Sequence, residues 1–430
     1  MEEAMSEAMM KNQKVVINPL TLPYQDPHTT PLEDLDVARP QLFETEEHWA
    51  YFERLRKEAP VHYCKDSAFG PYWSISSFEE IKNVDQRHDL FSSEPAITIE
   101  DADEDFMLPM FIAMDQPKHD EQRRVVQPAV MPKNLQKFES IIRERTGQLL
   151  DSLPINEEFD WVEKVSIELT TMMLATIFDF PYEDRRKLTY WSDVVTGAVY
   201  KDFTQESQEK AQADLLECLG TFSEIWQERV KNPGEFDMIT MLAHNETTKD
   251  MVNNPMEYLG NLILLIVGGN DTTRNSMTGS VYALNKYKGE YDKLRADESL
   301  IPNMVSEVIR WQTPLAHMRR VAKEDIELGG KQIKAGDKVV MWYVSGNRDE
   351  SVFEDPHKLI IDRKNARSHV SFGFGIHRCM GNRLAEMQLK ILWEEILARF
   401  SFVETLREPS RSQSVFVKGY NDLPVRLHRK

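Results

Sequence analysis

The stretch of sequence that decides the fold is Phe372-Gly373-Phe374-Gly375-Ile376-His377-Arg378-Cys379-Met380-Gly381, which carries one of the three cysteines of the chain. Its three glycines can take positive φ and can pass close to a flat object, so they favour a tight loop. Apolar residues at helical spacing follow Gly381. Cys379 therefore lies at the N-terminus of a predicted helix, where the helix dipole and unpaired N–H groups favour the thiolate over the thiol.

A thiolate beside a loop rich in glycine predicts a metal ligand that faces a planar metal complex. A buried, inert cysteine in an ordinary turn is the alternative interpretation. A structural zinc site fits poorly because it needs four Cys or His ligands, and Cys64 and Cys218 lie in unrelated segments. A haem iron bound by thiolate needs only this one sulfur.

The length of 430 residues and the lack of a Ser/Gly-rich or Pro-rich linker predict one large domain, which we place at residues 45–430. Residues 1–44 contain repeated prolines without periodicity, so we expect an extended lead-in. We then expect a helix that Thr45 caps and that ends at Pro60, and short strands at 61–63 and 72–75. Helical patterns dominate the rest, apart from a hairpin at 326–333, so the predicted fold is mainly α with small sheets.

The net charge of −19 and the pI near 5.1 argue against nucleic acid or an anionic membrane as a partner. Residues 1–13 lack the basic start and apolar centre of a signal peptide. The strongest apolar run, 262–267, is far shorter than the roughly twenty residues that span a bilayer, so we expect no membrane anchor. Few cysteines, one of them a metal ligand, indicate a reducing cytoplasm rather than a disulfide framework.

A second informative element is a predicted helix that begins at Asn254-Pro255, with Asn254 as its cap. Its apolar run gives way to Gly268-Gly269-Asn270-Asp271-Thr272-Thr273. A glycine inside a helix costs about 1 kcal/mol relative to alanine, and a buried acid needs a partner. Such departures cluster at functional sites, although helix packing through small residues, with Asp271 on the surface, is an alternative.

Two charged pairs also lie at helical spacing. His119 and Arg123 follow Pro117 and are four residues apart on one helix face, so both can reach the same anion. A solvated surface is the alternative for such a charged helix. Glu307 and Arg310 are three residues apart, which alone indicates only an ordinary helical ion pair.

The stretch 372–381, together with Ala385, resembles the haem-binding motif of the cytochromes P450. The resemblance covers nearly the whole chain after Thr45. Runs such as 111–115, 264–277, 301–320 and 377–386 are similar to the soluble bacterial P450 hydroxylases that attack the terminal carbon of alkanes and fatty acids. The resemblance implies the P450 fold, with haem b (iron protoporphyrin IX) between a long distal helix and the helix that follows the cysteine loop.

The resemblance also implies roles for individual residues. Cys379 would bind the iron, and His119 with Arg123 would bind one haem propionate. Arg320 would bind the other propionate, although Arg319 is close enough to compete. Thr272 would donate a hydrogen bond to iron-bound O2, and Asp271 would relay protons. The other residues expected to contact the cofactor are Gly268, Gly269, Phe372, Gly373, His377, Gly381 and Ala385. Glu307, Arg310 and an upstream arginine, here Arg363, would form a structural network.

The implied activity is monooxygenation at the end of a linear, apolar small molecule delivered through a narrow channel. We expect Leu264, Leu265, Leu315 and Phe416 to line that channel, segment 95–109 to cover it, and a lid near 182–204. Electrons would come from a ferredoxin and a ferredoxin reductase, with docking near Arg378 and Arg383. A hydroxylase of terpenoids or steroids, a peroxide-driven P450 and a haem-binding sensor are the alternatives.

Overall fold

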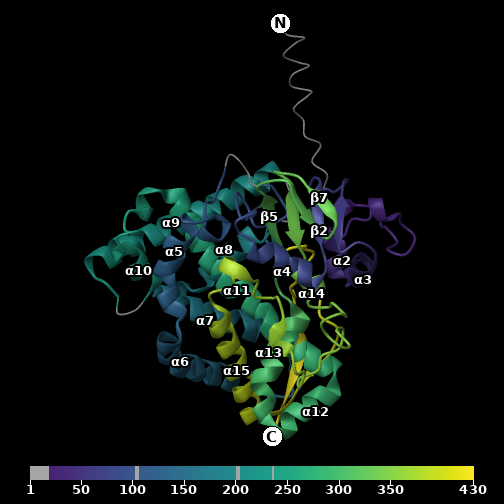
Figure 1. Ribbon diagram of the computed structural model, residues 1–430. Coiled ribbons are helices and arrows are strands. Elements are labelled where there is room, and N and C mark those ends of the chain that lie inside the picture. Colours follow the sequence, from purple (N-terminus) through teal and green to yellow (C-terminus); the bar gives the residue numbers. More distant parts are fainter. Residues whose placement is uncertain (1–18, 102–105, 200–203, 235–236) are drawn as a thin grey trace.

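The computed structural model describes residues 19–101, 106–199, 204–234 and 237–430. Helices form most of the molecule; β2, β5 and β7 lie near α2 and α3, whereas the C-terminal strands, in yellow, lie near α12 and α13 (Figure 1). The α-helices are α2 (Pro40–Glu44), α3 (His48–Glu58), α4 (Phe78–Gln86), α5 (Lys118–Val126), α6 (Pro132–Asp151), α7 (Ile167–Phe178), α8 (Arg186–Val195), α9 (Gln205–Lys231), α10 (Met238–His244), α11 (Pro255–Lys286), α12 (Lys288–Ala296), α13 (Ile301–Gln312), α14 (Tyr343–Gly346) and α15 (Asn382–Arg399). The predicted helical fold is therefore confirmed.

The strands form three small sheets. They are β1 (Val61–Cys64), β2 (Tyr72–Ile75), β3 (Phe91–Ser92), β4 (Glu158–Asp160), β5 (Met318–Ala322), β6 (Ile326–Leu328), β7 (Lys331–Ile333), β8 (Lys338–Met341), β9 (Phe400–Thr405) and β10 (Pro424–Arg429). The largest sheet has the order β1-β2-β8-β5-β3, in which only β2 and β8 pair in parallel. The strands expected at 61–63 and 72–75 and the hairpin at 326–333 are confirmed.

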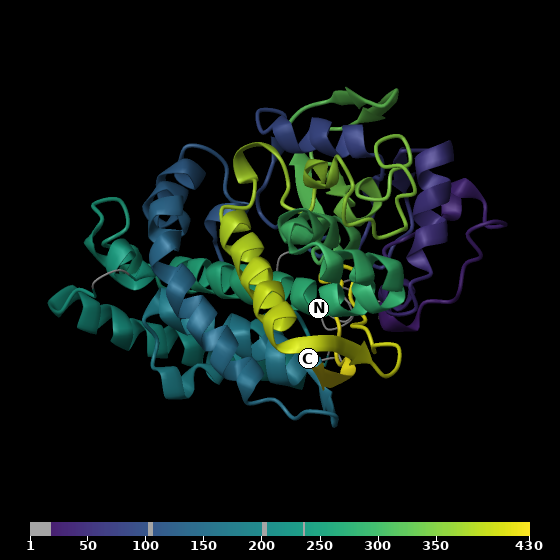
Figure 2. The ribbon, with the colours of Figure 1, turned by 90° about the horizontal axis from the view of Figure 1, so that it is seen from below.

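Helix α11 is the central element and is 32 residues long. Helix α15 lies across it in the view from below (Figure 2). The N-terminal half of α11 packs into one apolar core with α5, α7, α9 and α10, and its C-terminal half packs into a second core with α13 and α15. The helix begins at the predicted residue, but Asn254 does not cap it, because its side-chain amide donates to Glu257 at 3.0 Å.

The N-terminal segment differs from the expectation of an extended lead-in to residue 44. Leu35, Val37 and Phe43 are buried in a core cluster with Trp342, because this segment packs against the largest sheet. Thr45 ends α2 by bonding back to the Gln41 carbonyl, and α3 starts only at His48. The part of the lead-in at 1–18 lies outside the described residues.

The segment expected to be an irregular lid also differs in part. Residues 186–195 form the regular helix α8, and Trp191 within it is fully buried against the core. Tyr200, which belonged to the same expectation, lies outside the described residues. In the described ranges, no helix combines the length and the apolar character needed to cross a membrane.

A buried ion network fixes α13 to the chain that leads to the cysteine loop. Both carboxylate oxygens of Glu307 accept from Arg310 at 2.7 Å, and Arg363 donates to the same carboxylate at 3.0 Å. All three side chains are buried, and Arg310 also donates to three backbone carbonyls, of Asn347, Pro356 and Lys358. The predicted network of Glu307, Arg310 and Arg363 is therefore confirmed as a structural feature.

We expect Glu307→Gln to lower the free energy of unfolding by about 3–5 kcal/mol, because it leaves two buried guanidinium groups without a carboxylate. Denaturant unfolding followed by circular dichroism measures this change. Glu53→Gln is the matched control, since Glu53 pairs with Lys57 on the exposed face of α3, and it should leave the midpoint nearly unchanged. If both substitutions lowered the free energy of unfolding equally, the buried network would not be the source of the stabilisation.

Candidate functional site

A cavity of about 220 Å³ lies between α11 and the loop that precedes α15. It brings together most of the residues that the sequence predicts. These are Arg123, Leu264, Leu265, Gly268, Gly269, Thr272, Leu315, Arg320, Phe372, Gly373, His377, Cys379, Gly381 and Ala385. His119, Asp271 and Phe416 do not line the cavity.

Cys379 presents its sulfur to this cavity just before α15 begins. Its backbone N–H donates to the Phe372 carbonyl at 2.7 Å, and the N–H groups of Gly381 and Asn382 point at the sulfur. Its accessible surface belongs to the cavity wall. Burial among protein atoms raises the pKa of the Cys379 thiol, despite these N–H groups and the nearby Arg123. The expected lowering of this pKa is therefore wrong for the chain alone; a metal ion bound to the sulfur would favour the thiolate.

The cysteine loop owes its shape to two glycines and one acid. Gly373 and Gly375 have φ of +68° and +66°, a conformation that L side chains rarely adopt. A Cβ at Gly375 would lie 2.5 Å from the Asp85 carbonyl, so α4 and the loop can touch only through glycine. The Asp85 carboxylate accepts from the Phe374 N–H at 2.7 Å, from the Tyr343 hydroxyl at 2.8 Å and from Arg320 at 2.8 Å.

Sequence reasoning missed Asp85, although a signal was present. Asp85 shares the apolar face of α4 with Phe78, Ile81 and Val84, and an acid on such a face needs buried donors.

Four basic side chains meet along one edge of the cavity. Arg123 and Arg320 line it, and the rings of His119 and His377 lie 4.2 Å apart beside them. Nδ1 of His119 contacts Asp120 at 2.7 Å, and Nε2 of His377 contacts the Ser93 hydroxyl at 2.9 Å. The other ring nitrogens, His119 Nε2 and His377 Nδ1, are buried and have no hydrogen-bond partner among the described residues. Burial lowers the pKa of His119, and it lowers the pKa of His377 to about 2.

The structure separates the two candidate arginines. Side chains alternate between the faces of a strand, so neighbours in β5 point to opposite sides of the sheet. Arg320 reaches the cavity and Asp85, whereas Arg319 donates to the Glu100 carbonyl at 2.9 Å and pairs with Asp101 at 2.8 Å, outside the cavity.

Helix α11 contributes a hydroxyl to the cavity and turns its acid away. The Thr272 hydroxyl lines the cavity and donates to the Gly268 carbonyl at 2.9 Å. Asp271 is fully buried on another side of the helix, where it accepts from Ser192 of α8 and pairs with Arg274. Burial raises the pKa of Asp271, and Arg274 opposes that rise.

The remaining wall is mostly apolar, and it includes side chains that the sequence did not single out. Besides Leu264, Leu265 and Leu315, these apolar residues include Phe111, Ile112, Leu174, Ile177, Phe178, Met238 and Met318. Phe416 was expected here, but its ring packs on His317 with 5.3 Å between ring centroids. The Leu315–Val417 bridge and the bond from Ala316 N–H to the Phe416 carbonyl set that arrangement.

These features fit haem. One sulfur faces the cavity, the helix opposite is open at Gly268, and two arginines with two orphaned imidazole nitrogens form a cationic edge suited to two carboxylates. Cys379 would bind the iron, and Arg123, His119, His377 and Arg320 would hold the propionates. The fold and site thus define a haem-thiolate protein.

Comparisons with known proteins agree. The family description "Cytochrome P450" matches residues 191–420. The solved structure of CYP153D17 from Sphingomonas sp. PAMC 26605 is 50% identical, with a TM-score of 0.87 over 92% of this chain and 99% of that one. Linalool 8-monooxygenase of Pseudomonas putida is 35% identical over 92% of this chain and 99% of its own length. Methyl-branched lipid omega-hydroxylase of Mycobacterium tuberculosis (strain ATCC 25618 / H37Rv) is 31% identical over 87% and 90%. The chain belongs to the cytochrome P450 family, its cofactor is iron protoporphyrin IX, and its activity is that of a monooxygenase.

We expect Arg320→Ala to release haem about tenfold faster or more, because a hydrogen bond to a charged group contributes about 1.5–3 kcal/mol. Transfer of haem to excess apomyoglobin measures the rate. Arg319→Ala is the matched control, one residue away on the opposite face of β5, and it should release haem at the rate of the unaltered protein. The same acceleration in both variants would contradict the assignment of Arg320 to a propionate.

Proposed function

We propose that this P450 hydroxylates the terminal carbon of medium-chain alkanes or fatty acids. The observation that supports the proposal is the small number of charged side chains in the cavity wall. Arg123 and Arg320 are the only charged side chains that line it within the described residues, and we assign both to the propionates. The rest of the wall offers a linear chain apolar contacts, and each buried methylene contributes about 0.8 kcal/mol.

Positional selectivity must come from the shape of the cavity, because a terminal C–H bond is stronger than the secondary bonds beside it. A tenfold preference for one carbon requires only about 1.4 kcal/mol at the transition state. Leu264, Leu265 and Leu315 supply branched side chains that could hold a chain end-on. The name of the lipid omega-hydroxylase describes terminal attack, whereas linalool is a terpenoid, so a terpenoid hydroxylase is the second candidate function.

The residues of α11 would manage protons. Haem bound through a thiolate supplies the chemistry of O2 activation, including cleavage of the O–O bond. The Thr272 hydroxyl would exchange its bond to the Gly268 carbonyl for a bond to the ligand in the cavity. Asp271 can serve as a relay only after its carboxylate leaves Arg274 and Ser192, so its role requires a rotation of its side chain.

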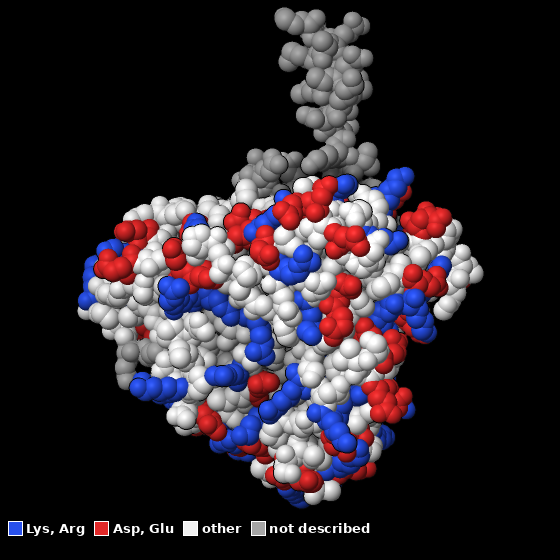
Figure 3. Space-filling model, in the orientation of Figure 1, with Lys and Arg blue, Asp and Glu red and all other residues white. Residues whose placement is uncertain are grey.

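Electrons would come from a ferredoxin, itself reduced by a ferredoxin reductase. Figure 3 shows Lys and Arg side chains gathered near α5, α6 and the start of α15 on an otherwise mixed face. Arg124, Lys133, Arg378 and Arg383 are exposed there, and no ion pair joins them to another described residue. Free cations on a protein of net charge −19 fit an acidic partner.

The first test is a spectral titration of the ferric protein with dodecane, dodecanoic acid, linalool and a rigid steroid. We expect the linear chains alone to displace the water ligand and shift the iron from low spin to high spin. Gas chromatography of the products should then show 1-dodecanol or 12-hydroxydodecanoic acid. A shift with linalool or the steroid only, or oxidation inside the chain, would overturn the assignment.

We expect Arg383→Glu to raise the KM for an acidic ferredoxin severalfold and to weaken the dependence of turnover on ionic strength, because a rim charge acts mainly on encounter. Steady-state reduction at two salt concentrations measures both effects. Arg295→Glu, at an exposed position of α12, reverses the same charge away from this face and should leave both unchanged. If turnover does not depend on ionic strength in any variant, electrostatic docking at the surface around Arg383 is excluded.

A further inference from the structure

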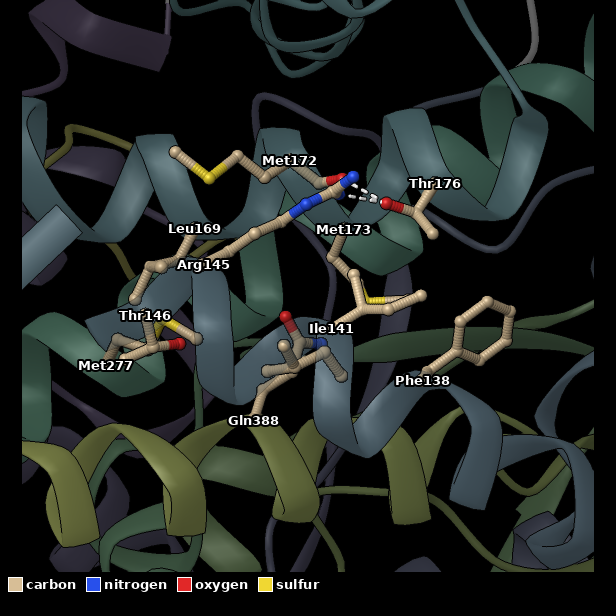
Figure 4. A pocket seen from close by; sticks show the side chains of 11 residues that line it. Phe138, Ile141, Arg145, Thr146, Leu169, Met172, Met173, Thr176, Met277 and Gln388 are labelled. Carbon is tan, nitrogen blue, oxygen red and sulfur yellow. Dashed lines mark hydrogen bonds between the residues drawn. The ribbon is translucent and has the colours of Figure 1, made fainter. Parts of the chain in front are cut away.

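A second and much smaller pocket lies between α6, α7, α11 and α15 (Figure 4). Its cavity volume is about 10 Å³, close to the minimum for one water molecule. It shares one wall residue with the haem cavity, namely Gln388 of α15. Figure 4 shows Gln388 pointing from α15 into the pocket. The Gln388 side chain therefore forms part of the wall of both cavities.

The polar groups at this partition lack protein partners. Gln388 is 4% exposed and Thr146 of α6 is 1% exposed, yet neither side chain forms a hydrogen bond with any residue in the described ranges. On the haem side, Thr273 is 4% exposed and is equally unbonded among described residues. Buried polar groups are nearly always hydrogen-bonded, and ordered water is the usual partner when protein supplies none.

The outer end of the pocket reaches the protein surface. Ile141 of α6 is 36% exposed, and Arg145 beside it is partly exposed. The Arg145 guanidinium donates to the Met172 carbonyl at 3.0 Å and to the Thr176 hydroxyl, as Figure 4 shows. These bonds tie α6 to α7 and place a charged group beside the mouth of an otherwise largely apolar pocket.

We propose that this pocket is a water passage to the haem cavity, with the Gln388 amide as its gate. Water would bind Thr146 on the outer side, the amide of Gln388 in the middle and Thr273 on the inner side. The proposal rests on the proposed function, because it takes the larger cavity as the haem site. The volume of the smaller pocket is close to that needed for one water molecule and is too small for a hydrocarbon chain.

Such a passage would supply the cavity with water that can carry protons, which the Asp271 carboxylate does not reach. The Asp271 carboxylate lies outside the cavity, whereas Ser276 lines the cavity and donates to the Thr272 carbonyl at 2.8 Å. Hydroxyls at Thr272, Thr273 and Ser276 thus continue the polar path from Gln388 along α11. An apolar substrate filling the space near Leu264 and Leu265 would leave this path open, so water could still reach the hydroxyl that handles protons.

Solvent proton relaxation in the ferric, haem-loaded protein tests the proposal, because the paramagnetic iron relaxes only water that approaches it. Water itself is the probe. We expect Gln388→Leu to lower the paramagnetic part of this relaxation by more than half, and to keep it low when dodecane is added. Gln388→Glu retains a polar gate and should keep the relaxation of the unaltered protein. Gln148→Leu makes the same change on the exposed face of α6 and should also keep the relaxation of the unaltered protein.

The absorption spectrum of each variant establishes that haem content and spin state match before relaxation is compared. Unchanged relaxation in Gln388→Leu would overturn the passage, because the partition would then carry no water. The measurement without dodecane needs no substrate, so its result is independent of whether linear chains bind. Failure of the substrate assignment would instead appear only in the spectral titration and the product analysis.

Discussion

The Asp85 carboxylate is the interaction on which the arrangement of the haem site depends. A buried carboxylate is costly unless donors surround it, and here it receives the Phe374 N–H, the Tyr343 hydroxyl and the Arg320 guanidinium. Those donors belong to the cysteine loop, to α14 and to β5. One acid on α4 therefore fixes the thiol-bearing loop and a cationic edge of the cavity relative to each other, before any cofactor binds.

Much of this site could be predicted where the chemistry depends on neighbours in sequence. The cysteine loop, the interrupted helix α11 and the Glu307–Arg310 pair each carry their information within a few residues. The choice between Arg319 and Arg320 could not be made that way, because it depends on which face of β5 meets the cavity. The pKa of Cys379 was predicted in the wrong direction for a related reason, since burial is a sum over distant segments and outweighs the local N–H groups.

The errors in the fold have similar causes. The early prolines suggested an extended lead-in, but Leu35 and Phe43 find a core surface against Trp342 that only the folded chain creates. Phe416 is expected in the channel, yet its ring packs on His317 beside the bridge between Leu315 and Val417. In each case a local pattern indicated an element correctly or nearly so, while tertiary packing decided which way its side chains face.

The adjacent glycines Gly268 and Gly269 of α11 have different structural reasons. A Cβ at Gly268 would meet nothing within 4 Å, so its absence leaves free space in the cavity, whereas a Cβ at Gly269 would lie 2.8 Å from Leu174 of α7. On the N-terminal side of these glycines, α11 presents the apolar side chains of Leu264 and Leu265. On the C-terminal side, it presents the hydroxyls of Thr272 and Ser276. At 1.5 Å per residue, about 18 Å separates the ends of this span. One helix can thus offer apolar contacts to a substrate and hydrogen bonds to water at different positions along its length.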